Sequence, residues 1–207
     1  MIIAIVGSGG KTSLLKQLAQ QYRSEGKSVF VTTTTHMFIE EDTLLTDDAK
    51  LIIQTLKETG YVMAGIPVKN KIRALSLETY DKVCAHADVV LVEADGSKHM
   101  PLKFPKENEP VIPHNTDEIY VVCGMHAIGQ KAKDVCHRLE LVKNCLGIDD
   151  DTLITPDHVH KLVLEGYLRP LSEQYPTVKI TVMPQNIPIY QRKHTGKRRY
   201  KENEKIN

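Results

Sequence analysis

The chain alternates between short apolar runs and longer segments in which apolar residues recur every three or four positions. Short apolar runs are typical of buried strands, and the longer period is typical of amphipathic helices. The runs predict strands at residues 2–6, 28–35, 61–64, 88–93, 118–123 and 178–183. The longer period predicts helices at residues 12–25, 47–59, 77–87, 135–146 and 156–166. Strands that alternate with helices in this way favour an α/β fold with a mainly parallel sheet.

The first predicted strand runs straight into a glycine-rich turn, GSGGKTS, from which the first predicted helix begins. Glycines let backbone N–H groups turn toward an anion, Lys11 supplies a positive charge, and Thr12 offers a hydroxyl to Mg²⁺. The turn therefore predicts a phosphate loop for ATP or GTP. Its predicted nucleotide-binding residues are Gly7, Ser8, Gly9, Gly10, Lys11, Thr12 and Ser13. The loop is two residues shorter than the common form, which would need glycine at Ile5.

Two further predicted strands end in polar side chains, and ligands of open parallel sheets bind beyond the carboxyl ends of strands. Glu93 ends a buried apolar strand and is predicted to anchor Mg²⁺ beside Thr12 or to orient a water, with an acid in a surface salt bridge as the alternative. Asp95 is predicted to bind metal, orient a water or act as a base on an acceptor, with a simple Asp-Gly turn as the alternative. Thr34 is the predicted nucleotide contact of the threonine run, and His36 is the acid–base candidate, with a polar loop residue as the alternative.

Two segments differ in composition from the predicted α/β core. Residues 101–115 contain four prolines and predict a lid-like loop, from which Lys103 would reach a phosphate or an acidic substrate. Residues 191–207 are rich in Lys and Arg and poor in apolar side chains, which predicts a basic, disordered tail. We therefore expect a nucleotide-binding domain at residues 1–190 and a tail at 191–207.

Composition limits the classes of partner. The net charge is +1 and the chain has no Trp, so neither nucleic acid nor a membrane is expected as a partner. The four cysteines form no C-x-x-C pair and predict reduced core residues. The N-terminus lacks the pattern of a signal peptide, so we expect a cytoplasmic protein.

Three segments together carry a family resemblance. They read VGSGGKTS at residues 6–13, TTTTH at residues 32–36 and VEADGSKHMPLKFPKENEPVIP at residues 92–113. The chain closely resembles the YqeC family, described as accessory proteins of selenium-dependent molybdenum hydroxylases, from its start to about residue 183. The resemblance implies a three-layer α/β/α fold of the P-loop NTPase type and a role in cofactor maturation.

The short phosphate loop is also similar to that of the Mur ligases, in which a glutamate at a later strand end helps to hold Mg²⁺. Glu93 stands in the corresponding context. The chain departs from the YqeC pattern at residues 182–188, which read VMPQNIP before the basic tail. If that segment contacts the base, the contact is altered here, so the choice between ATP and GTP stays open.

These residues predict a Mg²⁺-dependent nucleotide-binding protein that hydrolyses ATP or GTP or transfers a phosphoryl group to a small acceptor. Lys11 would hold the β- and γ-phosphates, Thr12 and Glu93 the metal, and Asp95 or His36 the acceptor proton. The alternative is a nucleotide-gated switch, without catalysis of its own, that docks a hydroxylase subunit or a maturation factor.

Overall fold

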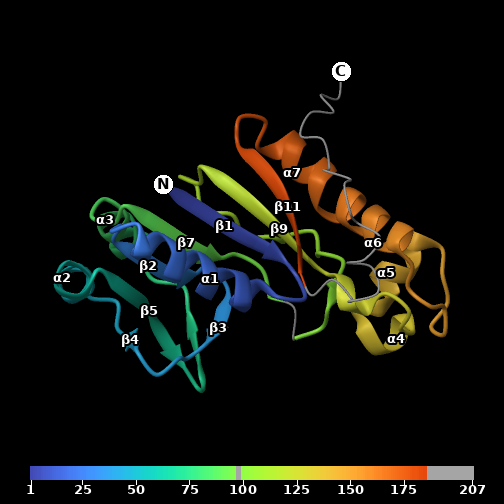
Figure 1. Ribbon diagram of the computed structural model, residues 1–207, viewed down its shortest axis with the longest axis horizontal. Helices are drawn as coiled ribbons and strands as arrows, with labels where there is room; N and C mark the ends of the chain where they lie inside the picture. The colour runs from blue at the N-terminus through green and yellow to red at the C-terminus, as the bar shows by residue number, and fades with distance from the viewer. Residues whose placement is uncertain (97–98, 186–207) are drawn as a thin grey trace.

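The computed structural model describes residues 1–96 and 99–185, and a central sheet with helices on both faces dominates it (Figure 1). Within these residues the sheet order is β11-β9-β1-β7-β2-β5-β6-β3, with β4 paired to β5. The parallel strands are β1 (Ile2–Gly7), β2 (Val29–Thr33), β4 (Thr43–Leu45), β5 (Tyr61–Val68), β7 (Val89–Glu93), β9 (Glu118–Gly124) and β11 (Lys179–Gln185). Strands β3 (His36–Phe38) and β6 (Lys71–Arg73) are antiparallel additions beyond β5.

The helices begin at local signals that the sequence carries. Asp48 caps α2 by accepting the N–H of Lys50 at 2.9 Å, and Thr155 forms a capping box with His158 at the start of α6. The helices are α1 (Lys11–Ser24), α2 (Ala49–Thr59), α3 (Leu77–Cys84), α4 (Ala132–Val135), α5 (Leu139–Leu146), α6 (Pro156–Val163) and α7 (Arg169–Gln174). A π-helical segment, η2 (Leu164–Leu168), joins α6 to α7, and a short 3₁₀ turn, η1 (Met125–Ala127), follows β9.

The core consists of apolar clusters on the two faces of the sheet. Side chains alternate along a strand, so Ile3 and Ile5 pack on one face with the apolar stripe of α1. Ala4 and Val6 point to the other face, where they join the cluster that contains residues of α5, α6 and α7. The α2 and α3 residues pack on this second face, against β7 and β2. The chain therefore has the α/β fold of the P-loop type that the sequence predicts, in three layers with a mainly parallel sheet.

The order of the strands brings together the carboxyl ends of β1, β7 and β2, which carry the polar residues predicted for the site. Strand β7 lies between β1 and β2, and Glu93 is in register with Ile5 on one side and Thr33 on the other. The chain crosses from one side of β1 to the other before it forms β9. Ligands of doubly wound sheets bind at such a reversal, beyond the carboxyl ends of the strands.

Several predicted elements differ in detail. The helix predicted at residues 135–146 is broken, because Arg138 adopts a left-handed conformation with φ 60° between β10 (Cys136–His137) and α5. Strand β10 pairs in parallel with β8 (Leu102–Lys103), so the predicted lid-like loop contains a strand. Leu51, an apolar residue of the helix predicted at residues 47–59, is 43% exposed. Strands β3, β4 and β6 were not predicted. The predicted tail, residues 191–207, lies outside the described residues.

No helix in the described part of the chain is long and apolar enough to cross a membrane.

Candidate functional site

The phosphate loop leaves β1 at Gly7 and enters α1 at Lys11, and two of its glycines leave no room for a side chain. Gly7 has φ +88°, and a Cβ there would lie 2.1 Å from the Val122 carbonyl oxygen. Gly9 has φ +78°, and its Cβ would lie 2.5 Å from the Cα of Gly124. Both positions require glycine for conformation and for space. The loop is therefore held tightly against the end of β9.

The loop lysine lies inside the turn. Lys11 is 5% exposed, and its ammonium donates to the carbonyl oxygen of Gly7 at 2.8 Å. Burial lowers the pKa of Lys11, while the charges of Glu93 and Asp95 act in the opposite direction. Thr12 and Ser13 follow on the exposed side of the first turn of α1. A cation inside the turn and exposed hydroxyls at a helix N-terminus suit a phosphate with its metal.

Glu93 is a buried carboxylate at the carboxyl end of β7. The residue is 8% exposed, and no described residue donates a hydrogen bond or forms an ion pair to its carboxylate. Its backbone carbonyl is fixed by the hydroxyl of Thr33 at 2.7 Å and the N–H of Thr34 at 3.1 Å. Burial raises the pKa of Glu93, and the charge of Lys11 opposes this. A buried carboxylate of this kind costs free energy until a cation binds it, so Glu93 fits the predicted metal anchor.

Asp95 is fully buried, and its carboxylate is already occupied. It accepts the N–H of Gly7 at 3.2 Å and the hydroxyl of Tyr167 at 2.8 Å, and Lys103 donates to its second oxygen. Burial acts to raise the pKa of Asp95, and Lys103 acts to lower it. With its oxygens engaged and no exposed surface, Asp95 is placed as a support of the loop. The roles of Asp95 as a metal ligand, a water-orienting group or a base on an acceptor stay predictions, and each requires the carboxylate to leave one of these partners.

Lys103, predicted to reach a phosphate or an acidic substrate, is paired in the same way. Its residue is completely buried, and the ammonium donates to Asp95, to the carbonyl oxygen of Gly96 at 2.6 Å and to Glu109 at 2.6 Å. An ammonium has three hydrogens, so these contacts use all of them. Lys103, Asp95 and Glu109 therefore form a wall of paired charges behind the phosphate loop. In this arrangement Lys103 has no donor left for a phosphate.

Residues far apart in the sequence complete this wall. Arg138 makes a two-pronged ion pair with Glu109, with both N–O distances at 2.6 Å. Although burial opposes it, the hydrogen bonds from Arg138 and Lys103 hold the pKa of Glu109 at about 2. Tyr167 reaches Asp95 from the π-helical segment η2. Sequence reasoning missed Glu109, Arg138 and Tyr167, and no motif or spacing marks them.

The remaining predicted residues lie at the same edge of the sheet in different settings. The Thr34 hydroxyl donates to the carbonyl oxygen of Val111 at 2.7 Å, which ties the proline-rich loop to the end of β2. His36 is exposed at the start of β3 and pairs in the ladder with Arg73. Geometry thus leaves His36 accessible, whereas the hydroxyl of Thr34 has a structural partner.

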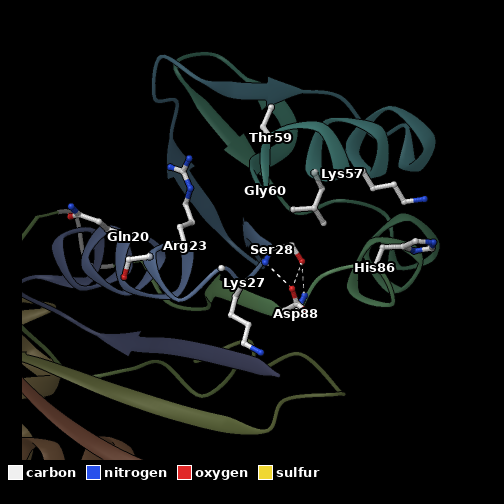
Figure 2. Close-up of a pocket in the computed structure, with 12 residues that line it drawn as sticks. Gln20, Arg23, Lys27, Ser28, Lys57, Thr59, Gly60, His86 and Asp88 are labelled. Atoms are coloured by element: carbon white, nitrogen blue, oxygen red, sulfur yellow. Dashed lines mark hydrogen bonds between the residues drawn. The ribbon is translucent and has the colours of Figure 1, made fainter.

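A surface hollow of about 580 Å³ lies at the opposite edge of the sheet, where β2, β5 and β7 begin (Figure 2). Its Arg23 and Lys57 belong to the last turns of α1 and α2, where basic side chains offset the helix dipoles. Its Asp88 accepts the N–H and the hydroxyl of Ser28, both at 2.8 Å. These charges have structural roles, so we place the candidate site at the phosphate loop instead. The described residues contain no group of His, Cys, Asp and Glu arranged to hold a metal by themselves.

Known proteins show where the chain belongs. A protein named "Uncharacterized protein YqeC" from Escherichia coli strain K12 is 34% identical over 162 residues, which cover 74% of this chain and 63% of that protein. The chain thus spans less than two thirds of the length of this relative. A solved structure, the MinC:MinD cell division protein complex of Aquifex aeolicus, is similar with a TM-score of 0.45 and 13% identity, over 94% of this chain and 72% of that chain.

The family model described as YqeC protein matches residues 3–140. The match includes β1, the phosphate loop, the threonine run, Glu93 and the proline-rich segment through Arg138. On this match, the chain belongs to the YqeC family.

Proposed function

We propose that the protein binds ATP or GTP with Mg²⁺ at the phosphate loop and hydrolyses it. The observation that carries the proposal is the buried Glu93 carboxylate, which has no partner among the described residues and ends the strand beside the loop that holds Lys11. Lys11 binds the β- and γ-phosphates, and Thr12 and Glu93 hold the metal. Bound Mg²⁺ supplies charge neutralisation for the phosphates and for the buried Glu93.

The paired charges behind the phosphate loop affect which acceptor of the phosphoryl group the site can use. Asp95, predicted to act on an acceptor, and Lys103, predicted to reach a phosphate or an acidic substrate, are fully buried and paired with each other. His36 is the accessible acid–base candidate at this edge. The arrangement favours attack by water over transfer to an acceptor gripped by Asp95 and Lys103. It also favours the second candidate function, a nucleotide-gated switch in which slow hydrolysis times the docking of a partner.

The biological setting rests on the family. YqeC proteins are described as accessory proteins of selenium-dependent molybdenum hydroxylases, so we place the nucleotide cycle in the maturation of these enzymes. The partner is then a hydroxylase subunit or another maturation factor in the cytoplasm.

The nucleotide site is tested by thermal unfolding. ATP or GTP with Mg²⁺ at a hundred times its dissociation constant stabilises the native state by about 2.7 kcal/mol, roughly 5 to 10 °C for a chain of this size. Lys11→Ala abolishes the shift, because it removes the cation inside the loop.

The matched control is Lys16→Ala on the same helix. Lys16 is an exposed lysine paired with Glu40 at 2.7 Å, so its loss leaves the nucleotide shift intact. A wild-type melting temperature that ATP, GTP and ADP all leave unchanged refutes nucleotide binding.

A further inference from the structure

The two short antiparallel strands β3 and β6 have an apolar face and a basic face. Met37 and Ile72 are paired across the two strands and lie buried in the cluster that contains the apolar stripe of α1. Side chains alternate along a strand, so the neighbours of these two residues point the other way. We call these neighbours the basic face; they are His36, Phe38, Lys71 and Arg73.

The basic face lies beside the carboxyl ends of β2 and β7. Strand β3 begins two residues after Thr34, whose N–H donates to the carbonyl oxygen of Glu93 at 3.1 Å. Two residues of chain span no more than about 7 Å, so His36 lies close to the end of β7. The chain that leaves β7 also reaches this face, because the ring of His99 stacks on Phe38 with 5.1 Å between the ring centroids. Segments that leave two neighbouring strands therefore meet at Phe38.

The basic face combines exposed rings with positive charge that no acid neutralises. Phe38 is 41% exposed even though His99 stacks on it and the ammonium of Lys71 lies 4.4 Å from its ring centroid. Among the residues that the structure describes, neither Lys71 nor Arg73 forms an ion pair or a hydrogen bond. Cations without a counter-ion attract an anion, and an exposed ring offers a surface on which a planar ligand stacks.

We propose that the basic face, together with His99, is a second ligand site, which binds a small planar aromatic molecule that carries a carboxylate or a phosphate. The ring of this ligand stacks on Phe38 and His99, and Lys71 and Arg73 hold its anionic group. The ligand then lies beside the end of β7, where the predicted metal anchor is. The site is made of side chains outside the phosphate loop, so the proposal goes beyond the proposed function and does not depend on it.

The strand order separates this site from the segment considered above for the nucleotide base. Strands β9 and β11 lie on one side of β1, whereas β7, β2, β5, β6 and β3 lie on the other. The described part of the segment at 182–188 belongs to β11. We therefore assign the basic face to a second ligand and not to the base of the nucleotide.

The test compares FMN, a planar ring with a phosphate, with riboflavin, the same ring without it. Stacking quenches the fluorescence of this ring, so a fluorescence titration with ADP or GDP and Mg²⁺ in excess measures both affinities. The wild-type protein binds FMN about 10-fold or more tightly than riboflavin, because Lys71 and Arg73 hold the phosphate. Phe38→Ala lowers the affinity for FMN roughly 10-fold or more through the loss of stacking. Combining Lys71→Gln with Arg73→Gln removes the preference for FMN over riboflavin.

The variants change the outer face and leave the buried Met37 and Ile72 in place, and thermal unfolding checks that they fold. Leu77→Ala is the matched control for the ring, because Leu77 is an apolar side chain that is 64% exposed elsewhere. Arg23→Gln is the matched control for the charges, since it removes a guanidinium that lies 5.0 Å from the ring centroid of Tyr61. Both controls keep the affinity for FMN.

Three results overturn the proposal: a wild-type protein that does not bind FMN at millimolar concentration, equal affinities for FMN and riboflavin, or an affinity for FMN that Phe38→Ala leaves unchanged. Displacement of FMN by ADP or GDP, with a loss of nucleotide affinity in Phe38→Ala, also overturns it and assigns the basic face to the nucleotide base. Single-stranded RNA that displaces FMN and binds more tightly overturns it in favour of nucleic acid. A protein that binds FMN as expected but neither ATP nor GTP refutes the proposed function and leaves this second site standing.

Discussion

At the scale of single residues, the site contains carboxylates that respond to pH in opposite directions. Burial raises the pKa of Glu93, so its ionised form is unfavourable in the folded protein. Arg138 and Lys103 hold the pKa of Glu109 at about 2 against the effect of burial, so its ionised form is favourable there. Stability from Glu109 is present above its ordinary pKa of 4.5 and is lost as the pH falls toward 2.

Glu93→Gln should stabilise the nucleotide-free protein at neutral pH. The wild-type carboxylate loses stability as the pH rises through its raised folded pKa, whereas glutamine stays neutral throughout. Urea unfolding between pH 4 and pH 8 should show a gain for the variant that disappears below the ordinary pKa of 4.5. A variant that is less stable than the wild type at pH 8 would show that Glu93 has a favourable partner in the free protein.

The same substitution should separate binding from turnover. Glu93→Gln keeps the shape of the side chain and removes the charge that we assign to the metal. Loss of one preorganised electrostatic contact costs about a hundredfold or more in kcat. We expect nucleotide binding to remain and phosphate release to fall by that factor in a steady-state assay. Unchanged release would assign Glu93 a structural role and favour the switch over the enzyme.

At the scale of elements, the phosphate loop depends on close contact with its neighbours. Gly9 packs against Gly124 and the carbonyl oxygen of Pro101, and Gly7 packs against Val122. The phosphate loop therefore packs against the end of β9 and against Pro101 of the proline-rich segment. Its shape is set by these contacts as well as by the freedom of its own glycines.

Gly9→Ala tests the packing of the phosphate loop against these neighbours, with Gly129→Ala as its control. Both glycines have a positive φ, +78° and +84°, so both variants carry a backbone penalty of about 1 kcal/mol. A Cβ at Gly129 meets nothing within 4 Å, whereas one at Gly9 would lie 2.6 Å from the Pro101 oxygen. Gly9→Ala should therefore unfold at a lower temperature than Gly129→Ala and should lose nucleotide binding. Equal unfolding temperatures in a calorimetric scan would contradict the packing argument.

At the scale of the whole molecule, the position of the site follows from the strand order. Strands β1, β7 and β2 are neighbours, so the loop, Glu93 and the threonine run come to one edge although they are far apart in sequence. The apolar clusters of the described residues already cover both faces of the sheet, from Ile2 to Met183. The residues that form the apolar core, from Ile2 to Met183, therefore also include the candidate site.

A chain shortened to residues 1–190 should therefore keep its thermal stability and its response to nucleotide. The residues removed are basic and carry few apolar side chains, so they have little to bury. Differential scanning calorimetry with and without ATP and Mg²⁺ compares the two chains. A lower unfolding temperature for the shortened chain would show that residues 191–207 pack on the domain.

Features that neighbouring residues encode could be predicted from the sequence. The glycine loop, the first helix and the apolar strands follow from local periodicity and from backbone preference, so they were predictable, as was the order of strand and helix. Elements of two or three residues, such as β3 and β6, have too little periodicity to detect. The break at Arg138 has no such signal either, because a left-handed conformation at arginine follows from no local pattern, and the partner of its side chain, Glu109, lies 29 residues away.

Which charged side chains are accessible to a ligand follows from the three-dimensional packing and could not be predicted from the sequence. Asp95 looked like an acceptor base beside Glu93, but Tyr167, 72 residues later in the chain, and Lys103 complete its hydrogen bonds. Glu93, two residues before it, has no such partner among the described residues. The physical reason is that availability depends on burial and on which opposite charge the packing brings near. Neither is a property of the residue type or of its spacing along the chain.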